Sequence, residues 1–393
     1  MTVALPRPEE LSGPLPPAPT AFASRAPRRG HKATPGDAKL HNRTLVLQTL
    51  YVSGPMSRAD LARATGLTKV TVSVLVAELL AELLLRELGQ QEAQRPGKPA
   101  ILVDLARDAF AVVALDLSDH LRVRGALLDL DGRILTRADV PRDGATGDAV
   151  TELALELTRG LQSRAEVPIL GIGIGTPGVV DDSGTVRTAP NLGWTDLPLA
   201  RMFEERTGIR TVVENDANVA ALAEYSFGDS SDNFILIAIG QGVGSGLIIS
   251  GQPVQGYRFA SGEIGQVMVG TDLGLAAPYS REQVLEHWLS VPSLTRELDS
   301  RPREREQVLR EAGQRLGIAL APVIGVLNLA EVVLAGPVDL VDGTLADAAL
   351  EILRRRTMPD SHDDLVLRTS RQGEDLILRG ATAIVLKDRL GVT

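Results

Sequence analysis

Residues 212–224 read VVENDANVAALAE. The β-branched residues 211–213 predict the end of a buried strand, and the alanine-rich residues from Val219 onward recur at helical spacing. Four polar side chains lie between the two runs: Glu214, Asn215, Asp216 and Asn218. They follow the carboxyl end of a strand, which is where open α/β sheets bind their ligands.

The polar cluster has two interpretations. A helix N-cap would explain one of the four side chains, but a cap uses a single residue. A polyol ligand explains the whole cluster, because each sugar hydroxyl both donates and accepts, and adjacent Asn and Asp side chains match both roles. We therefore expect a sugar site at Asn215 and Asp216 in an α/β fold.

The composition is that of a globular protein with more than one domain. The chain has 393 residues, of which 44% are apolar, enough for two or three domains with buried cores. It has no cysteine, which excludes disulfides and thiolate metal sites. No apolar run reaches the roughly 18 residues of a membrane span, and prolines stand where a signal peptide would be apolar. We expect a cytoplasmic protein with no membrane partner.

The charge is distributed unevenly along the chain. Residues 1–107 contain 14 Lys+Arg and 9 Asp+Glu, a net charge of +5, whereas the remainder contains 27 against 41, a net charge of −14. A basic front end on an acidic body indicates an attached nucleic-acid module. We expect three parts: a disordered Pro/Arg-rich tail (1–39), a DNA-binding domain (40–107) and a ligand-binding domain (108–393).

The pattern over residues 40–105 predicts a winged helix-turn-helix. After a first helix, Ser57 caps a short helix over 58–65, Gly66 makes the turn, and Thr68 opens a third helix. A wing is expected within 89–105. The alternative is a small helical bundle that docks protein rather than DNA.

Lysine and arginine of this region would bind phosphates, and the third helix would read base edges. The residues expected to contact DNA are Arg58, Thr68, Lys69, Thr71, Ser73, Arg95 and Lys98.

The body contains two copies of a three-strand meander. The six expected strands are 110–117, 121–129 and 133–140, then 233–239, 244–249 and 253–257. A repeated unit of this kind predicts two lobes with a cleft between them. A buried strand at 331–335 and a closing helix at 376–390 are also expected.

Several motifs along the chain resemble those of the ROK family (repressor, open reading frame, kinase). They are GIGTPGV at 173–179, APNLGW at 189–194, ENDAN at 214–218, GQGVGSG at 240–246 and GEIG at 262–265. With the winged helix they cover residues 40–393 in consistent order. The resemblance implies a two-lobed, actin-like (ribonuclease-H-like) fold, as in sugar kinases. The family's enzymes phosphorylate hexoses with ATP, and its repressors sense sugars in the same cleft.

The resemblance also implies a sugar-binding set: Asn191, Asn215, Asp216, Glu263, Gln266 and Glu286. Asp216 matches the family's catalytic base, a role we expect to be vestigial here. Gln266 replaces a histidine that neighbours a zinc-binding cysteine cluster in the family, and without cysteines we expect no metal. Any one of the six could instead be a surface or capping residue.

The motifs for nucleotide binding are incomplete. Where the family's kinases carry Asp-Gly-Gly-Thr, this chain has Asp116-Leu117-Ser118-Asp119-His120, so side chains replace glycines and Asp119 would repel phosphates. The second loop retains three glycines, Gly242, Gly244 and Gly246, whose open amides suit an anion, although they could simply permit a tight hairpin. We therefore expect no enzyme activity and no cofactor.

The favoured function is that of a sugar-responsive transcriptional regulator, a repressor of carbohydrate-utilisation genes whose degenerate kinase cleft is the effector site. Its partners would be operator DNA, a sugar or sugar derivative, and its own copies in a homodimer or homotetramer. The alternative is an active ATP-dependent sugar kinase with a DNA-binding arm. A third hypothesis is a regulator whose cleft is vestigial and empty.

Overall fold

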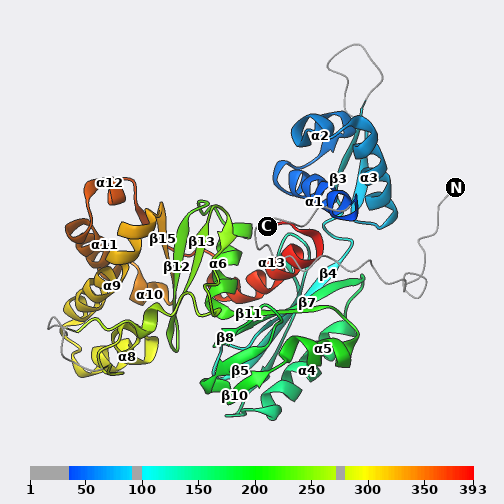
Figure 1. The fold of residues 1–393 in the computed structure, drawn as a ribbon. Helices are drawn as coiled ribbons and strands as arrows, with labels where there is room; N and C mark the ends of the chain where they lie inside the picture. Colours follow the sequence, from blue (N-terminus) through cyan, green and yellow to red (C-terminus); the bar gives the residue numbers. More distant parts are fainter. Residues whose placement is uncertain (1–34, 91–99, 271–278) are drawn as a thin grey trace.

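The computed structural model describes residues 35–90, 100–270 and 279–393. An N-terminal module stands on a body made of two lobes, each built on its own sheet (Figure 1). The body is therefore the two-lobed α/β architecture that was expected. In the described part of the chain, no single helix is long and apolar enough to cross a membrane, and the strongly bent pair 58–65 and 69–81 passes by length and composition alone.

The N-terminal module contains three helices and a small antiparallel sheet of order β1-β3-β2. Its elements are α1 (Pro35–Ser53), β1 (Met56–Ser57), α2 (Arg58–Thr65), α3 (Lys69–Ala81), β2 (Leu85–Gln90) and β3 (Ile101–Leu105). The hydroxyl of Ser57 accepts the Asp60 N–H at the start of α2, and Gly66 ends that helix with a φ of 70°. The chain bends by 117° between α2 and α3, as a helix-turn-helix requires.

Helix α1 begins five residues earlier than the sequence predicted. Residues 35–39 were assigned to a disordered tail, but they form the first turn of α1. Proline fits the first helical position because its missing N–H has no partner there, and Asp37 adds a favourable charge in the first turn. Residues 1–34, the rest of the expected tail, lie outside the described residues.

The first lobe has a five-stranded sheet of order β11-β7-β4-β5-β6. Its main elements are β4 (Ala111–Asp116), β5 (Arg122–Leu128), β6 (Ile134–Pro141), α4 (Asp148–Gln162), β7 (Ile169–Thr176), α5 (Leu199–Thr207) and β11 (Thr211–Asn215). Strands β4, β7 and β11 are parallel, and helices α4 and α5 share one hydrophobic core with them. A small sheet follows β7 and contains β8 (Val179–Val180), β9 (Val186–Ala189), the turn η3 (Pro190–Leu192) and β10 (Trp194–Leu197).

The second lobe repeats this topology with a sheet of order β14-β13-β12-β15-β16. Its strands are β12 (Phe234–Ile239), β13 (Val243–Ile249), β14 (Gln252–Pro253), β15 (Glu331–Ala335) and β16 (Val366–Thr369). Its helical elements are η4 (Ile264–Gln266), α7 (Leu285–Leu289), α8 (Val291–Ser300), α9 (Arg305–Leu327), α10 (Val338–Val341), α11 (Thr344–Arg356) and α12 (Pro359–His362). The expected strand over 253–257 is wrong beyond Pro253. Proline has no N–H for a ladder, and Gly256 turns the chain with a φ of 75°.

Two helices fill the space between the sheets: α6 (Asp216–Phe227) and, after the turn η5 (Gly373–Asp375), α13 (Leu376–Leu390). Their axes approach closely because Gly380 faces α6. A Cβ at this position would lie 1.9 Å from the backbone oxygen of Val219. In Figure 1 both helices lie between the lobes. A change in the packing of α6 therefore alters its contacts with α13.

The end of α13 also packs into the N-terminal module. Leu386, Leu390 and Val392 share a core with Leu47 and Leu50 of α1. Two hydrogen bonds, of 3.0 and 3.2 Å, also join the Gln48 side chain of α1 to the backbone of Thr393, just after α13. One helix thus contacts both lobes and the N-terminal module.

Candidate functional site

The junction of β11 and α6 holds the ENDAN motif. Asn215 is the N-cap of α6, since its Oδ1 accepts the N–H groups of Ala217 (2.9 Å) and Asn218 (3.2 Å). Its Nδ2 donates to the Gly178 oxygen at 2.9 Å. The capping interpretation therefore holds for this residue, and its side chain has little capacity left for a ligand.

Glu214 lies beneath the junction. It is buried, and its carboxylate accepts from the Asn215 N–H (2.8 Å), the Asn218 amide (3.1 Å) and the Gln255 amide (3.1 Å). Burial raises the pKa of Glu214, while these donors and the ammonium of Lys387 oppose the rise. Burial lowers the pKa of Lys387 to about 8. Glu214 and Asn218 thus fix the conformation of the loop, and the attraction between Glu214 and Lys387 links the loop to α13.

Asp216 is the residue of the motif whose charge interacts with carboxylates of both lobes. It is partly exposed, and its Oδ1 accepts the Ala217 N–H at 2.9 Å. Desolvation raises the pKa of Asp216 to about 7, helped by repulsion from Asp116 in the first lobe and from Glu263 in the second. Asp116 is a missed member of the site, since no local pattern connects it with Asp216.

Glu263, Gln266 and Glu286 form the other wall. The Glu286 carboxylate accepts the Val243 N–H at 2.9 Å and the Gln266 amide at 3.4 Å. Desolvation, then repulsion from Glu286, raises the pKa of Glu263, which is exposed. The Gln266 oxygen accepts the Tyr279 hydroxyl at 2.7 Å. An amide held in this way does not fit the family's structural zinc, for which this chain also has no cysteine.

The three glycines of the second loop face protein atoms. A Cβ at Gly246 would lie 2.4 Å from the Ala217 oxygen, one at Gly244 would lie 3.1 Å from the Ala217 Cβ, and one at Gly242 would lie 2.6 Å from a Glu286 carboxylate oxygen. The glycines therefore allow β13 and its hairpin to pack against the start of α6 and against Glu286. A phosphate would have to displace that carboxylate from the Val243 N–H.

The hairpin between β4 and β5 is closed by its own side chains. The buried Asp116 accepts the N–H (2.9 Å) and the hydroxyl (2.6 Å) of Ser118. Asp119 accepts the Leu121 N–H at 2.8 Å. The N–H groups of Ser118 and Leu121 thus already donate to carboxylates of the same hairpin.

Asn191 lies apart from this set. It sits in η3 with an exposed side chain, and its backbone oxygen accepts from Arg142 at 2.6 Å. Within the described ranges, no hydrogen bond joins its side chain to the other five expected residues. The structure thus brings together Asp216, Glu263, Gln266 and Glu286, with Asn215 as their support.

The residues expected to contact DNA are on α2 and α3. Thr68 caps α3 by accepting the Thr71 N–H at 3.1 Å, and the two hydroxyls lie 2.9 Å apart. The Ser73 hydroxyl donates to the Lys69 oxygen at 2.8 Å. Arg58 forms an ion pair with Glu87 of β2 at 2.9 Å, so it must exchange partners to reach a phosphate. Arg95 and Lys98 lie outside the described residues.

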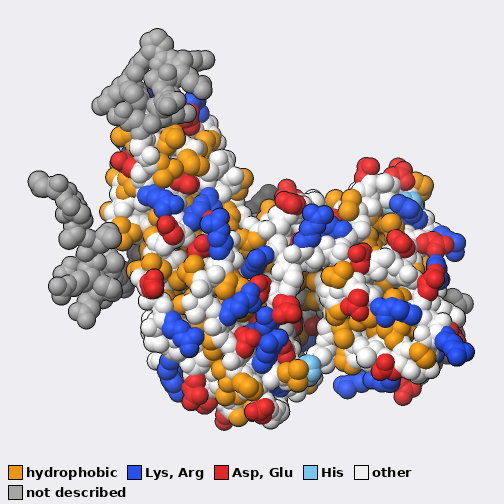
Figure 2. Space-filling view, turned by 180° about the vertical axis from the view of Figure 1, so that it is seen from behind, with side chains coloured by type: hydrophobic (Ala, Val, Ile, Leu, Met, Phe, Trp, Pro, Cys, Tyr) orange, Lys and Arg blue, Asp and Glu red, His pale blue; other side chains and the backbone are white. Residues whose placement is uncertain are grey.

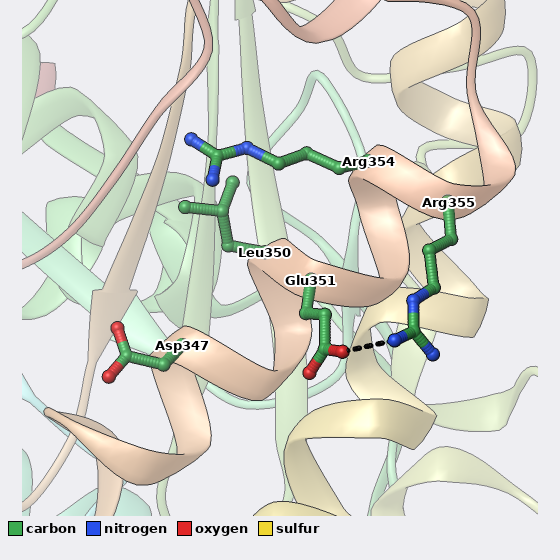
Figure 3. Close-up of a pocket in the computed structure, with 5 residues that line it drawn as sticks. All are labelled: Asp347, Leu350, Glu351, Arg354 and Arg355. Atoms are coloured by element: carbon green, nitrogen blue, oxygen red, sulfur yellow. Dashed lines mark ion pairs between the residues drawn. The ribbon is translucent and has the colours of Figure 1, made fainter.

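The surface is indented where the two lobes meet (Figure 2). A separate shallow hollow lies along α11 and is lined by Asp347, Leu350, Glu351, Arg354 and Arg355, all from one helix (Figure 3). Glu351 and Arg355 pair at 2.5 Å. Its charges balance one another and none of the site residues contributes to it, so it is not part of the candidate site.

Comparisons with known proteins identify the family of the chain. A model described as the ROK family matches residues 113–388. The xylose repressor of Caldicellulosiruptor bescii is 24% identical over 89% of this chain and 96% of its own length. The DNA-binding transcriptional dual regulator NagC of Escherichia coli (strain K12) is 25% identical over 89% of this chain and 93% of its own length.

Two further matches bear on the fold and on catalysis. The crystal structure of a ROK family transcriptional regulator, a homologue of the E. coli MLC protein, superposes with a TM-score of 0.79 and 24% identity, covering 90% of this chain and 97% of that one. A glucokinase of Halalkalibacterium halodurans is 27% identical over 64% of this chain and 88% of its own length. The regulators therefore match more of this chain than this kinase does.

Proposed function

Since the chain belongs to the ROK family, we propose that it is a sugar-responsive, DNA-binding transcriptional regulator, a repressor of carbohydrate-utilisation genes. The observation that carries this proposal is the contrast between the two halves of the site. Carboxylates accept the N–H groups of Ser118 and Leu121 in the first hairpin and of Val243 in the second, whereas Asp216 and Glu263 retain acceptor capacity. A sugar has hydroxyl donors for these acceptors, whereas the phosphate groups of a nucleotide have no donor for the carboxylates in the loops.

The sugar would bind between Asp216 on one wall and Glu263, Gln266 and Glu286 on the other. Asp216 and Glu263 repel each other across the site, so their charges oppose a close approach of the walls when no sugar is bound. Sugar hydroxyls would donate to both walls and remove that cost, which favours a closed arrangement. Asn191 would join the set only after movement of the β8-β9-β10 sheet.

A series of packed helices connects the proposed sugar site with the N-terminal module. Helix α6 begins at Asp216, α13 packs against α6, and the end of α13 shares a core with α1. A shift at the site would thereby turn the N-terminal module. In a homodimer or homotetramer, this would change the spacing between modules on an operator. By linkage, the operator must weaken sugar binding by the same factor as the sugar weakens operator binding.

The proposal is tested by footprinting the DNA that flanks the protein's own gene, with a panel of mono- and oligosaccharides. We expect protection of a roughly palindromic site that is lost with one sugar class. Protection unaffected by every sugar would favour a regulator with an empty cleft. No protection at low ionic strength would overturn the proposal.

A sugar kinase remains the second candidate because Asp216 is retained and a glucokinase matches much of the body. A coupled ATP-to-ADP assay over the same sugar panel separates the two functions. We expect no turnover above background, since the loop amides at Ser118 and Val243 are already bonded to carboxylates. Turnover that Asp216→Asn abolishes would establish the kinase.

Replacing Lys69 with alanine should weaken operator binding at every sequence. Lys69 is exposed at the start of α3, and in the described part of the chain it has no ion-pair partner. Loss of one phosphate contact lowers the slope of log Kd against log salt concentration by about 0.9. The measurement is fluorescence anisotropy from low to moderate salt. Arg164→Ala, which removes an exposed charge from the first lobe, is the control, and equal slopes for both variants would contradict the assignment.

Replacing Glu263 with alanine should leave DNA binding intact and blunt induction. Loss of one charged acceptor is expected to raise the sugar concentration for half-release of DNA by about tenfold or more. The measurement is release of labelled operator DNA during a sugar titration. Glu282→Ala, an exposed glutamate before α7, is the matched control. If Glu263→Ala releases DNA at the parent's sugar concentration, Glu263 does not contact the sugar.

A further inference from the structure

The exposed face of α3 is unusually apolar for a helix that meets DNA. Val70 is 74% exposed and Val74 is 51% exposed, one helical turn apart. Together with Lys69, Ser73 and Ala77 they line a shallow hollow on the surface. No residue of the described chain covers these two side chains, whereas Val72 and Val76 on the opposite face are buried.

The polar groups that would usually read bases are engaged within the helix. The hydroxyls of Thr68 and Thr71 lie 2.9 Å apart at the helix cap, and the Ser73 hydroxyl donates to the Lys69 oxygen. Of the residues that make bidentate contacts with guanine or adenine, the face carries no arginine, asparagine or glutamine, and its one lysine is Lys69. Since Lys69 is assigned to a phosphate, the groups of this face that remain for base recognition are the methyl groups of the two valines.

The charges around this face suit nucleic acid. Helix α3 carries one acidic residue, Glu78, and Glu82 follows it at the C-cap. Lys39 of α1 pairs with Glu78 at 2.8 Å, and Arg43 of α1 pairs with Glu82. Both carboxylates are therefore neutralised beside the exposed face, and Lys69 remains as a positive charge at its edge. In Figure 2 the N-terminal module shows hydrophobic and basic side chains side by side at its surface.

We propose that Val70 and Val74 read the 5-methyl groups of thymines in the major groove, and that they select operator half-sites with two thymines close together. The proposal rests on the DNA-binding function argued above. Thymine is the base that presents a methyl group in the major groove. The two valines are about 6 Å apart along the helix, and base pairs rise by about 3.4 Å, so the two thymines lie within about two base pairs of each other. Valine suits this role because its rotamer is nearly fixed in a helix.

The test replaces thymine by deoxyuridine, which lacks only the methyl group. The full-length protein first selects duplexes from a random pool, and each thymine of the best duplex is then changed in turn. At one or two positions per half-site, anisotropy should show about fourfold weaker binding, which corresponds to one buried methyl group. At the same position, Val70→Ala or Val74→Ala should weaken binding of the thymine duplex and abolish the further loss with deoxyuridine.

The controls separate this proposal from its alternatives. Val326→Ala, which shortens an 81% exposed valine of α9, should respond to deoxyuridine as the parent does. Tight binding without any deoxyuridine effect, or an unchanged effect in both α3 variants, would overturn methyl reading while leaving the DNA-binding function in place. Failure to select any duplex would overturn the function and the proposal together. Loss of self-association in the α3 variants, with DNA binding unchanged, would instead assign this face to protein docking.

Discussion

Replacing Arg368 with alanine is expected to destabilise the second lobe by about 3 kcal/mol, because it leaves two buried carboxylates without a counter-ion. Arg368 of β16 pairs with Glu331 of β15 and, at 3.1 Å, with Glu224 of α6. Glu224 is 1% exposed and Glu331 is 7% exposed. A quarter of the Arg368 side chain is exposed, so water replaces part of the lost interaction, and the expected value lies at the low end of the range for broken buried pairs.

Chemical denaturation monitored by fluorescence or circular dichroism measures this effect. Arg206→Ala is the matched control, since it breaks a two-bond pair with Glu152 on the surface of the first lobe. Both partners there are about half exposed, and we expect little change in the unfolding midpoint. Equal stabilities of the two arginine variants would show that the buried network does not support α6.

Replacing Asp216 with asparagine should raise stability and reduce the sugar response at the same time. The pKa of Asp216 is raised from 3.8 to about 7, so the folded protein holds a proton that the unfolded chain releases between these values. The ionised carboxylate therefore costs stability increasingly as pH rises from about 4 to about 7, and fully above 7. Asparagine removes this cost, worth about 2 kcal/mol after allowance for partial exposure.

Thermal unfolding of Asp216→Asn and the parent between pH 5 and pH 8 measures the difference. We expect the variant's advantage to grow up to pH 7 and then to level off. Its sugar titration should require at least about tenfold more sugar for DNA release, because a charged acceptor is lost. Asp182→Asn, at an exposed loop position, is the control. A pH-independent difference would mean that Asp216 has an ordinary pKa.

Much of the fold was predictable because long periodic segments carry their own signal. Strand β15 and helix α13 have the bounds expected from sequence, since both are apolar runs flanked by clear breaks. The third strand of the second meander was wrong because Pro253 and Gly256 override its apolar pattern. The start of α1 was missed because a proline at the first helical turn looks like the end of a tail.

The site was predictable only where motifs are continuous. The ENDAN segment identified the junction and the possibility of a helix cap, but it did not decide which of its side chains caps α6 and which faces a ligand. Asp116 and Asp216 interact because β4, which ends at Asp116, and β11, which precedes Asp216, lie on either side of β7 in the sheet. The local sequence around either residue does not indicate this proximity. Glu286 was placed among the sugar ligands, although its carboxylate already holds the Val243 N–H. These contacts join residues that are far apart in the sequence, so the spacing of residues within one segment does not predict them.

Helix α13 has a consequence for how the protein folds. Its last residues complete a core whose other members come mainly from the N-terminal module, α1 to β3, with Val112 from β4. During synthesis the N-terminal module therefore leaves the ribosome with its apolar underside uncovered, and this surface stays exposed until α13 has been made. Chaperone binding to early nascent chains, followed by release once α13 emerges, would be the natural outcome of this topology.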